Sequence, residues 1–190
     1  MKNILILLAL IVPFMIGCSD SIVSPESSTN PVNNNSQKSW ITLPKNPAMK
    51  VEDEYSASKL INGDVGGSVE LEINYVTQGS INIVIDAEIE VPAGAFSGEK
   101  NITMNINSDN GTATFYPSPE TFNKPLVFNM RISGVDLNGV APNSIDFEYI
   151  APDGTFAPLT CQKVVANGGV LRVDDALIPH FSVYGWVRFR

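Results

Sequence analysis

The sequence is poor in the side chains on which most catalytic and metal centres depend. Its 190 residues include one histidine and two cysteines, and 17% of them are charged. One imidazole and two thiols are few for a zinc site, which takes several such ligands. Basic residues are also scarce, since 12 Lys and Arg against 20 Asp and Glu give a net charge of −8. A nucleic-acid partner requires a basic patch, so we expect no nucleic-acid partner.

The longest apolar run lies at the N-terminus and ends at a cysteine. After Lys2, residues 4–17 are apolar, which is shorter than the about 20 residues of a membrane-spanning helix and typical of a secretory signal. The following "MIGC" (15–18) resembles the bacterial lipobox, with Met15 where that pattern prefers Leu. The resemblance implies cleavage of residues 1–17 as a signal peptide, acylation of Cys18 and membrane anchoring. By similarity to the enterobacterial sorting rule, Ser19 favours the outer membrane. The alternatives are an ordinary cleaved signal with a chance cysteine, or an uncleaved anchor.

The segment after Cys18 has a different composition. Residues 18–47 are rich in Ser, Asn and Pro, and they have too few large apolar side chains to offset the entropy of ordering. We expect a flexible tether, with a span of roughly 30 Å, before a domain at residues 48–190. Trp40, Ile41 and Leu43 are where we expect the chain first to touch that domain. With Cys18 acylated, Cys161 has no disulfide partner and is expected as a small buried strand residue.

Beyond residue 48, apolar residues recur at every second position in several segments. The alternation runs through residues 69–75, 81–89, 102–106, 126–132 and 145–149. Strict alternation indicates strands with one buried and one wet face. Turn-forming residues lie between these segments, at Gln78-Gly79, Asn110-Gly111, Asp153-Gly154 and Asn167-Gly168-Gly169. Because no segment has a sustained helical period, the sequence predicts an all-β fold, an antiparallel β-sandwich.

Three stretches of the domain resemble one family. "VPAGAFSGEKNITMNI" (91–106) resembles the Pro-x-Gly-Ala signature of the domain shared by zonula occludens proteins, netrin receptors and ankyrins. "FYPSPETFNKPLVFNM" (115–130) and "HFSVYGW" (180–186) are similar to two further stretches of that family, the second being its last strand. The chain also resembles lipoproteins of the Bacteroidota that carry this domain. The resemblance implies a β-sandwich used for protein contacts, with no substrate and no cofactor.

The Pro-x-Gly-Ala stretch has a physical interpretation of its own. Pro92 has no N–H for a ladder and so ends a strand, while Gly94 permits a turn that a Cβ would hinder. Ala95 and Phe96 are then expected to bury in the core. We interpret this stretch as a structural corner without chemistry.

Carboxylates gather on the predicted polar face of residues 69–90. With a hairpin loop in "YVTQGSIN" (75–82), Val76 lies opposite Ser80 and Glu70 lies opposite Asp86. That face carries five carboxylates, those of Glu70, Glu72, Asp86, Glu88 and Glu90. Like charges directly opposite are unfavourable, and a Ca²⁺ ion bound by Glu70, Asp86 and Glu88 would relieve this. The alternative is a solvated face whose charges splay apart or meet cations of a neighbouring strand.

The one histidine lies near the C-terminus, in "IPHFSVYGWVRFR" (178–190). In one regular strand, His180 shares a face with Ser182, Tyr184 and Trp186. No Gly-x-Ser-x-Gly motif supports a Ser-His-Asp hydrolase. Some eukaryotic relatives of the resembled domain cut themselves within a His-Phe-Ser sequence on this strand. That resemblance implies His180 as general base and Ser182 as nucleophile toward the Phe181 carbonyl. The alternative is that these residues serve packing.

We therefore expect a non-enzymatic, lipid-anchored protein of the bacterial cell envelope. Its β-sandwich would bind another protein or serve a structural role. One alternative is a self-cleaving domain cut between Phe181 and Ser182. Another is a surface glycan-binding lipoprotein, whose exposed rings would come from Trp40, Tyr55, Tyr116 and Trp186.

Overall fold

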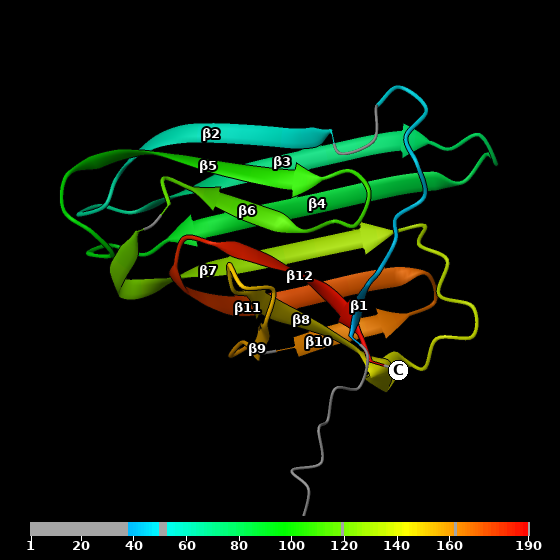
Figure 1. Cartoon of the computed structure of the whole chain (residues 1–190). Coiled ribbons are helices and arrows are strands. Elements are labelled where there is room, and N and C mark those ends of the chain that lie inside the picture. Colours follow the sequence, from blue (N-terminus) through cyan, green and yellow to red (C-terminus); the bar gives the residue numbers. More distant parts are fainter. Residues whose placement is uncertain (1–37, 50–52, 119, 162, 190) are drawn as a thin grey trace, which may run out of the picture. The chain divides into compact units, whose positions relative to one another are not determined.

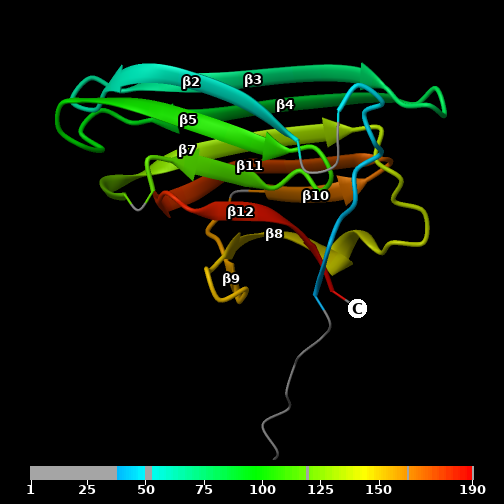
Figure 2. The same cartoon turned by 45° about the horizontal axis from the view of Figure 1, so that its top comes forward.

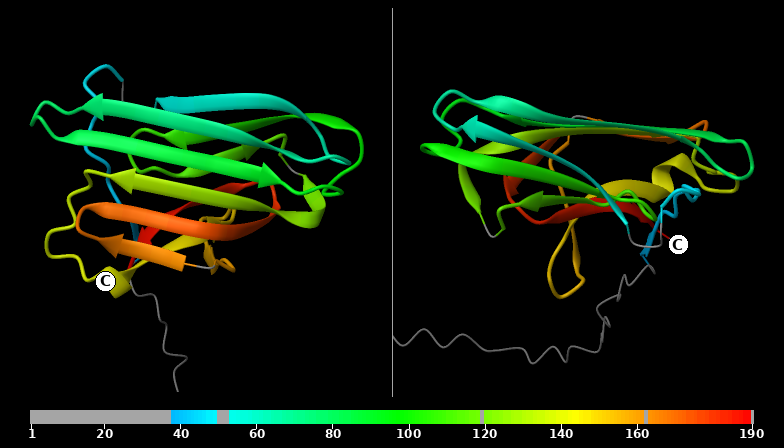
Figure 3. Two further views of the ribbon diagram at one scale, coloured as in Figure 1. Left: turned by 180° about the vertical axis from the view of Figure 1, so that it is seen from behind. Right: turned by 90° about the horizontal axis from the view of Figure 1, so that it is seen from above.

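Two antiparallel sheets packed face to face make up the folded part of the chain (Figure 1). The computed structural model describes residues 38–49, 53–118, 120–161 and 163–189. A seven-stranded sheet has the order β2-β5-β6-β12-β8-β9, with β1 beside β12, and a five-stranded sheet has the order β10-β11-β7-β4-β3. The predicted antiparallel β-sandwich is confirmed, and Figure 3 shows its two layers from behind and from above.

The strands are mostly long and regular. The seven-stranded sheet consists of β1 (Ser39–Trp40), β2 (Glu54–Asn62), β5 (Glu99–Asn107), β6 (Ala113–Tyr116), β8 (Ile145–Ile150), β9 (Phe156–Pro158) and β12 (Val183–Arg188). The five-stranded sheet consists of β3 (Gly67–Val76), β4 (Asn82–Val91), β7 (Thr121–Ser133), β10 (Lys163–Asn167) and β11 (Val170–His180). A 3-10 turn, η1 (Pro142–Ser144), precedes β8.

The core is built from the alternating apolar side chains of both sheets. In β4, Ile83, Ile85 and Ile89 are fully buried, while Asp86 and Glu90, at alternate positions, are exposed. The predicted apolar faces of β3, β5 and β7 are buried in the same way. Burial of one face of each sheet against the other supplies the main stabilisation of such a sandwich.

The Pro-x-Gly-Ala stretch forms the corner that the sequence predicts. β4 ends at Val91, directly before Pro92. Gly94 has a φ of +82° and donates its N–H to the Gly63 carbonyl at 2.7 Å. Ala95 and Phe96 are buried, as expected. The stretch therefore has a structural explanation that requires no ligand.

The turn between β3 and β4 is longer than predicted. Val76 pairs with Asn82 rather than with Ser80, which leaves residues 77–81 in the turn. Ser80 takes a left-handed φ of 59°, and this conformation closes the wider loop. The predicted register is therefore wrong by two residues, so each outward-facing residue keeps its face but changes its partner.

The predicted last strand is in fact two strands in different sheets. β11 ends at His180 and pairs with β7 and β10, whereas β12 begins at Val183 and pairs with β6 and β8. The chain crosses between the sheets at Phe181-Ser182. This crossing interrupts the alternation, because Phe181 and Tyr184 are both buried in the core. The prediction of one regular strand with His180, Ser182, Tyr184 and Trp186 on one face is therefore wrong.

The N-terminal segment belongs to the folded unit. β1 pairs with β12, Ile41 and Leu43 are buried, and the Tyr75 hydroxyl donates to the Pro44 carbonyl at 2.6 Å. In Figures 1 and 2 this segment runs from β12 across one end of both sheets. The expected contact of Trp40, Ile41 and Leu43 with the domain is confirmed, and the folded unit begins earlier than the predicted boundary at residue 48. The predicted signal peptide, Cys18 and the first part of the tether lie outside the described residues.

Candidate functional site

A partly buried ion pair fastens the N-terminal segment to the outer face of the seven-stranded sheet. Glu148 of β8 points away from the core, yet it is 2% exposed. The Lys38 ammonium donates to both of its carboxylate oxygens, at 2.9 and 2.7 Å. The same ammonium lies 5.5 Å from the Phe156 ring and 4.9 Å from the Phe189 ring, within cation–π range. We call Glu148, Phe156 and Phe189 the lysine cage.

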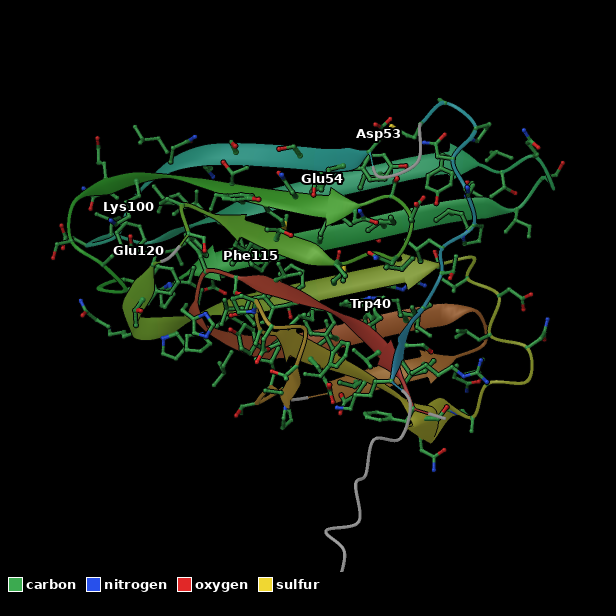
Figure 4. The ribbon with its side chains drawn as sticks, viewed as in Figure 1. Trp40, Asp53, Glu54, Lys100, Phe115 and Glu120 are labelled. Carbon is green, nitrogen blue, oxygen red and sulfur yellow. The ribbon has the colours of Figure 1, made fainter. Side chains whose placement is uncertain are left out.

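Trp40 of β1, which is labelled in Figure 4, lies over β12 beside the lysine cage. Its ring meets Phe156 edge to face, with centroids 5.5 Å apart. Beneath it lies Gly185 of β12, where a Cβ would approach Trp40 to 2.9 Å and the Thr112 side chain to 2.6 Å. The missing side chain at Gly185 is therefore what allows the N-terminal segment to lie close to the sheet.

Sequence reasoning missed the lysine cage. Glu148 occupies a position of "SIDFEYI" (144–150) that alternation assigns to the solvent-exposed face of the strand. Its partner Lys38 lies 110 positions away in the sequence. Nothing in the local pattern of either segment connects the two charges. The expectation that Trp40 touches the domain was the one usable signal.

The Phe181-Ser182 corner is held by hydrogen bonds on each side. The Phe181 N–H donates to the Glu120 carbonyl at 2.8 Å, and its carbonyl accepts the Ser118 hydroxyl at 3.2 Å. The Ser182 carbonyl accepts the Phe115 N–H at 3.1 Å. These contacts are those of a fixed crossing between two sheets.

An ion pair lies beside this corner. The Lys100 ammonium lies 3.3 Å from the Glu120 carboxylate and 5.7 Å from the centroid of the Phe96 ring. Figure 4 shows Lys100 and Glu120 close together at this end of the sandwich. Both side chains are partly exposed, so the pair is expected to contribute little to stability.

His180 is engaged by tyrosines rather than by Ser182. The Tyr184 hydroxyl donates to the His180 carbonyl at 2.6 Å and lies 3.5 Å from its Nδ1. The Tyr149 ring meets the imidazole edge to face at 4.9 Å. Burial, with Tyr149 adding to it, raises the pKa of Tyr184 above its ordinary value. Among the described residues, no hydrogen bond joins His180 to the Ser182 hydroxyl, although self-cleavage needs a base in contact with its nucleophile.

The acidic residues lie on the outer face of the five-stranded sheet, as predicted. Because of the longer turn, Glu70 lies opposite Glu88 and Glu72 lies opposite Asp86. The predicted pairing of Glu70 with Asp86 is therefore wrong. On its other side Asp86 lies opposite Arg131 of β7, so a cation from the neighbouring strand meets the acidic row.

A shallow hollow of about 310 Å³ lies over these strands. Its charged lining combines both signs: Glu70, Glu72, Asp86, Glu88, Arg131, Arg172 and Asp174. Arg172 donates to Asp174 at 2.7 Å. In the part of the chain that the structure describes, no group of three or more Asp, Glu, His or Cys side chains is arranged to hold a metal ion. The calcium hypothesis for Glu70, Asp86 and Glu88 thus gains no support from the geometry.

The remaining candidate residues do not form a common site. Trp186 is fully buried, Tyr55 stacks on Tyr75, and Tyr116 is exposed on β6. Cys161 is half-buried, and desolvation together with the nearby Asp146 raises the pKa of its thiol to about 11. A thiol with such a pKa is a poor nucleophile at neutral pH.

Comparison with known proteins adds no assignment. No family model, no curated protein and no solved structure matches this chain. The described residues also contain no helix long and apolar enough to cross a bilayer.

Proposed function

We propose that this chain is a lipid-anchored protein of the bacterial cell envelope, whose β-sandwich acts without catalysis as a protein-binding or structural module. The observation that carries the proposal is the apolar run at residues 4–17 that ends in Gly17-Cys18. Acyl chains on Cys18 would hold the protein at the membrane, since each buried methylene contributes about 0.8 kcal/mol. Ser19 favours the outer membrane as the destination.

The arrangement of the sandwich supports a binding or structural role. The His180 imidazole is held by Tyr184 and Tyr149, and the outer face of the five-stranded sheet presents charges of both signs. Such a face suits a polar contact with another protein. In such contacts the pattern of charges determines which partner binds more than it determines how tightly the partner binds.

Metabolic labelling tests the lipid anchor. The full chain is expressed in a bacterial host supplied with an alkyne-tagged fatty acid, and a Cys18→Ser variant serves as the control. We expect label and membrane association in the wild type, and an unlabelled, unprocessed chain in the variant. A processed wild-type chain without label would show an ordinary secretory signal instead.

Recovery of partners from the native envelope tests the binding role. The tagged full chain, released in mild detergent, is expected to bring down a specific protein. A glycan array that gives the stronger, saturable signal would favour the glycan-binding alternative instead.

A further inference from the structure

The contacts of the N-terminal segment are those by which a folded domain recognises an extended peptide. Ser39 and Trp40 pair with the edge of β12, and the Ile41 N–H donates to the Trp186 carbonyl at 3.2 Å. Lys38 fills the lysine cage, and Leu43 is 2% exposed. Main-chain pairing at a strand edge combined with side-chain pockets is a common mode of peptide recognition.

The groove that receives this segment is formed by other parts of the chain. Glu148 comes from β8, Phe156 from β9 and Gly185 from β12. Both sheets are complete without β1, which adds two residues beside β12. Ile41 and Leu43 of the segment are part of the core, so a copy whose segment leaves must receive an equivalent segment to keep its core filled.

If the segment left the groove, polar groups of the groove would lose their partners. Without Lys38, the Glu148 carboxylate would lose both of its charge-assisted hydrogen bonds. Because that side chain is almost fully buried, water could not easily replace them. The edge of β12 at Val187 and Arg188 would also lose its β1 partner. A segment that carries a cationic side chain and an extended backbone replaces both contacts, and Lys38–Trp40 of the chain itself is such a segment.

We propose that this groove also accepts the Lys38–Leu43 segment of a second copy of the chain, so that two copies exchange their N-terminal segments. The complementarity of that segment is established, because the same residues fill the groove within one copy. Exchange of a terminal element keeps every native contact and is a low-cost route to dimers. Anchoring of copies to one membrane would raise their effective concentration, and this one argument rests on the proposed lipid anchor.

A charge-swap experiment tests the exchange. One full-length chain carries Lys38→Glu and a second, differently tagged full-length chain carries Glu148→Lys. Neither can fill its own groove, because each opposes two like charges. When the two chains exchange segments, the unchanged Lys38 of one meets the unchanged Glu148 of the other, and the two substituted positions form a reversed ion pair. We expect recovery of one tag to bring down the other in stoichiometric amount, whereas two tagged copies of the same variant do not associate.

Matched controls keep the result decisive. A single chain with both changes regains the ion pair within one copy and shows that reversal itself is tolerated. Co-recovery of the mixed variants no greater than that of same-variant pairs overturns the proposal. This readout is independent of lipid labelling, so its failure differs from failure of the proposed anchor.

A peptide assay covers the case in which a charge-reversed variant does not fold. The full-length chain with Lys38→Met and Trp40→Ala, whose own segment has lost both the ammonium and the ring that hold it in the groove, is titrated with a labelled synthetic peptide of residues 38–43, and binding is followed by fluorescence anisotropy. Saturable binding that is lost when norleucine replaces the peptide lysine, or when the chain also carries Glu148→Gln, supports the groove. Absence of binding by the lysine peptide overturns it.

Discussion

The two outer faces of the sandwich use the same kinds of side chain in opposite ways. On the five-stranded sheet, Arg172 and Asp174 form an ion pair whose side chains are 49% and 17% exposed. On the seven-stranded sheet, Lys38 and Glu148 form an ion pair whose side chains are 24% and 3% exposed. Water screens the first pair, whereas the ammonium of the second lies against the rings of Phe156 and Phe189, and Phe156 in turn contacts Trp40.

This difference shows that the setting of a charge decides its energetic weight. Exposed ion pairs contribute at most about 1 kcal/mol, because water competes for both partners. A buried pair is costly to form, yet the loss of one partner leaves a charge in a poor solvent. We therefore expect the N-terminal segment to depend on its ion pair, and the outer face of the five-stranded sheet to tolerate changes of charge.

Removal of the Lys38 charge has the largest expected effect. Lys38→Met keeps an apolar stem between the two rings but leaves Glu148 without its cation. We expect the free energy of unfolding of the full chain to fall by about 3 kcal/mol in urea titration.

The control removes both charges. Lys38→Met with Glu148→Gln leaves no buried ion, so its stability should return to within about 1 kcal/mol of the wild type. A double variant as unstable as the single variant would mean that packing, and not the charge, matters at this site.

A side chain beneath Trp40 has the next largest effect. In Gly185→Ala the new Cβ meets Trp40 at 2.9 Å and Thr112 at 2.6 Å, so the segment must shift. We expect a loss of about 2 kcal/mol in thermal or urea unfolding, as is usual for overpacking. Gly79→Ala is the matched control, because its Cβ has only the Thr77 hydroxyl within 4 Å, at 3.8 Å. Equal losses at the two glycines would contradict the crowding argument.

A charge reversal on the five-stranded sheet has a small effect of opposite sign. Glu88→Lys replaces a carboxylate that lies opposite Glu70 by a cation. We expect stabilisation by about 0.5 kcal/mol at low ionic strength, and less at high salt. Glu90→Lys, at a position opposite Ser68, should gain less. If Glu88→Lys destabilises the chain by more than the control does, the acidic row has a role that solvation does not explain.

The Phe181-Ser182 bond is expected to stay intact. His180 contacts Tyr184 and Tyr149. Within the described residues, its ring makes no hydrogen bond to Ser182. The intact mass of the purified chain should show one uncleaved species, as in a Ser182→Ala control. Two fragments in the wild type alone would restore the self-cleavage hypothesis.

Sequence reasoning succeeded where the physics is local. Alternation predicted the buried faces of the strands, and Pro92 and Gly94 predicted a corner, because each depends on backbone geometry nearby. It failed at the β3–β4 turn, where one left-handed residue, Ser80, shifts the register. It also failed for the last strand, which changes sheets after His180.

The lysine cage was beyond such reasoning for a different reason. Alternation assigns Glu148 to an outer face, and this assignment is correct. Whether an outer face is wet depends on which distant segment covers it. Here the cover is Lys38–Trp40, and short-range patterns contain no information about contacts across 110 positions.

Two double-mutant cycles test the contrast between the two faces most directly. One cycle combines Lys38→Met with Glu148→Gln, and the other combines Arg172→Met with Asp174→Asn, all in the full chain by urea unfolding. We expect a coupling free energy of about 2 kcal/mol or more for the first pair and below about 0.5 kcal/mol for the second. Equal coupling in the two cycles, or the larger value for Arg172 and Asp174, would contradict the account.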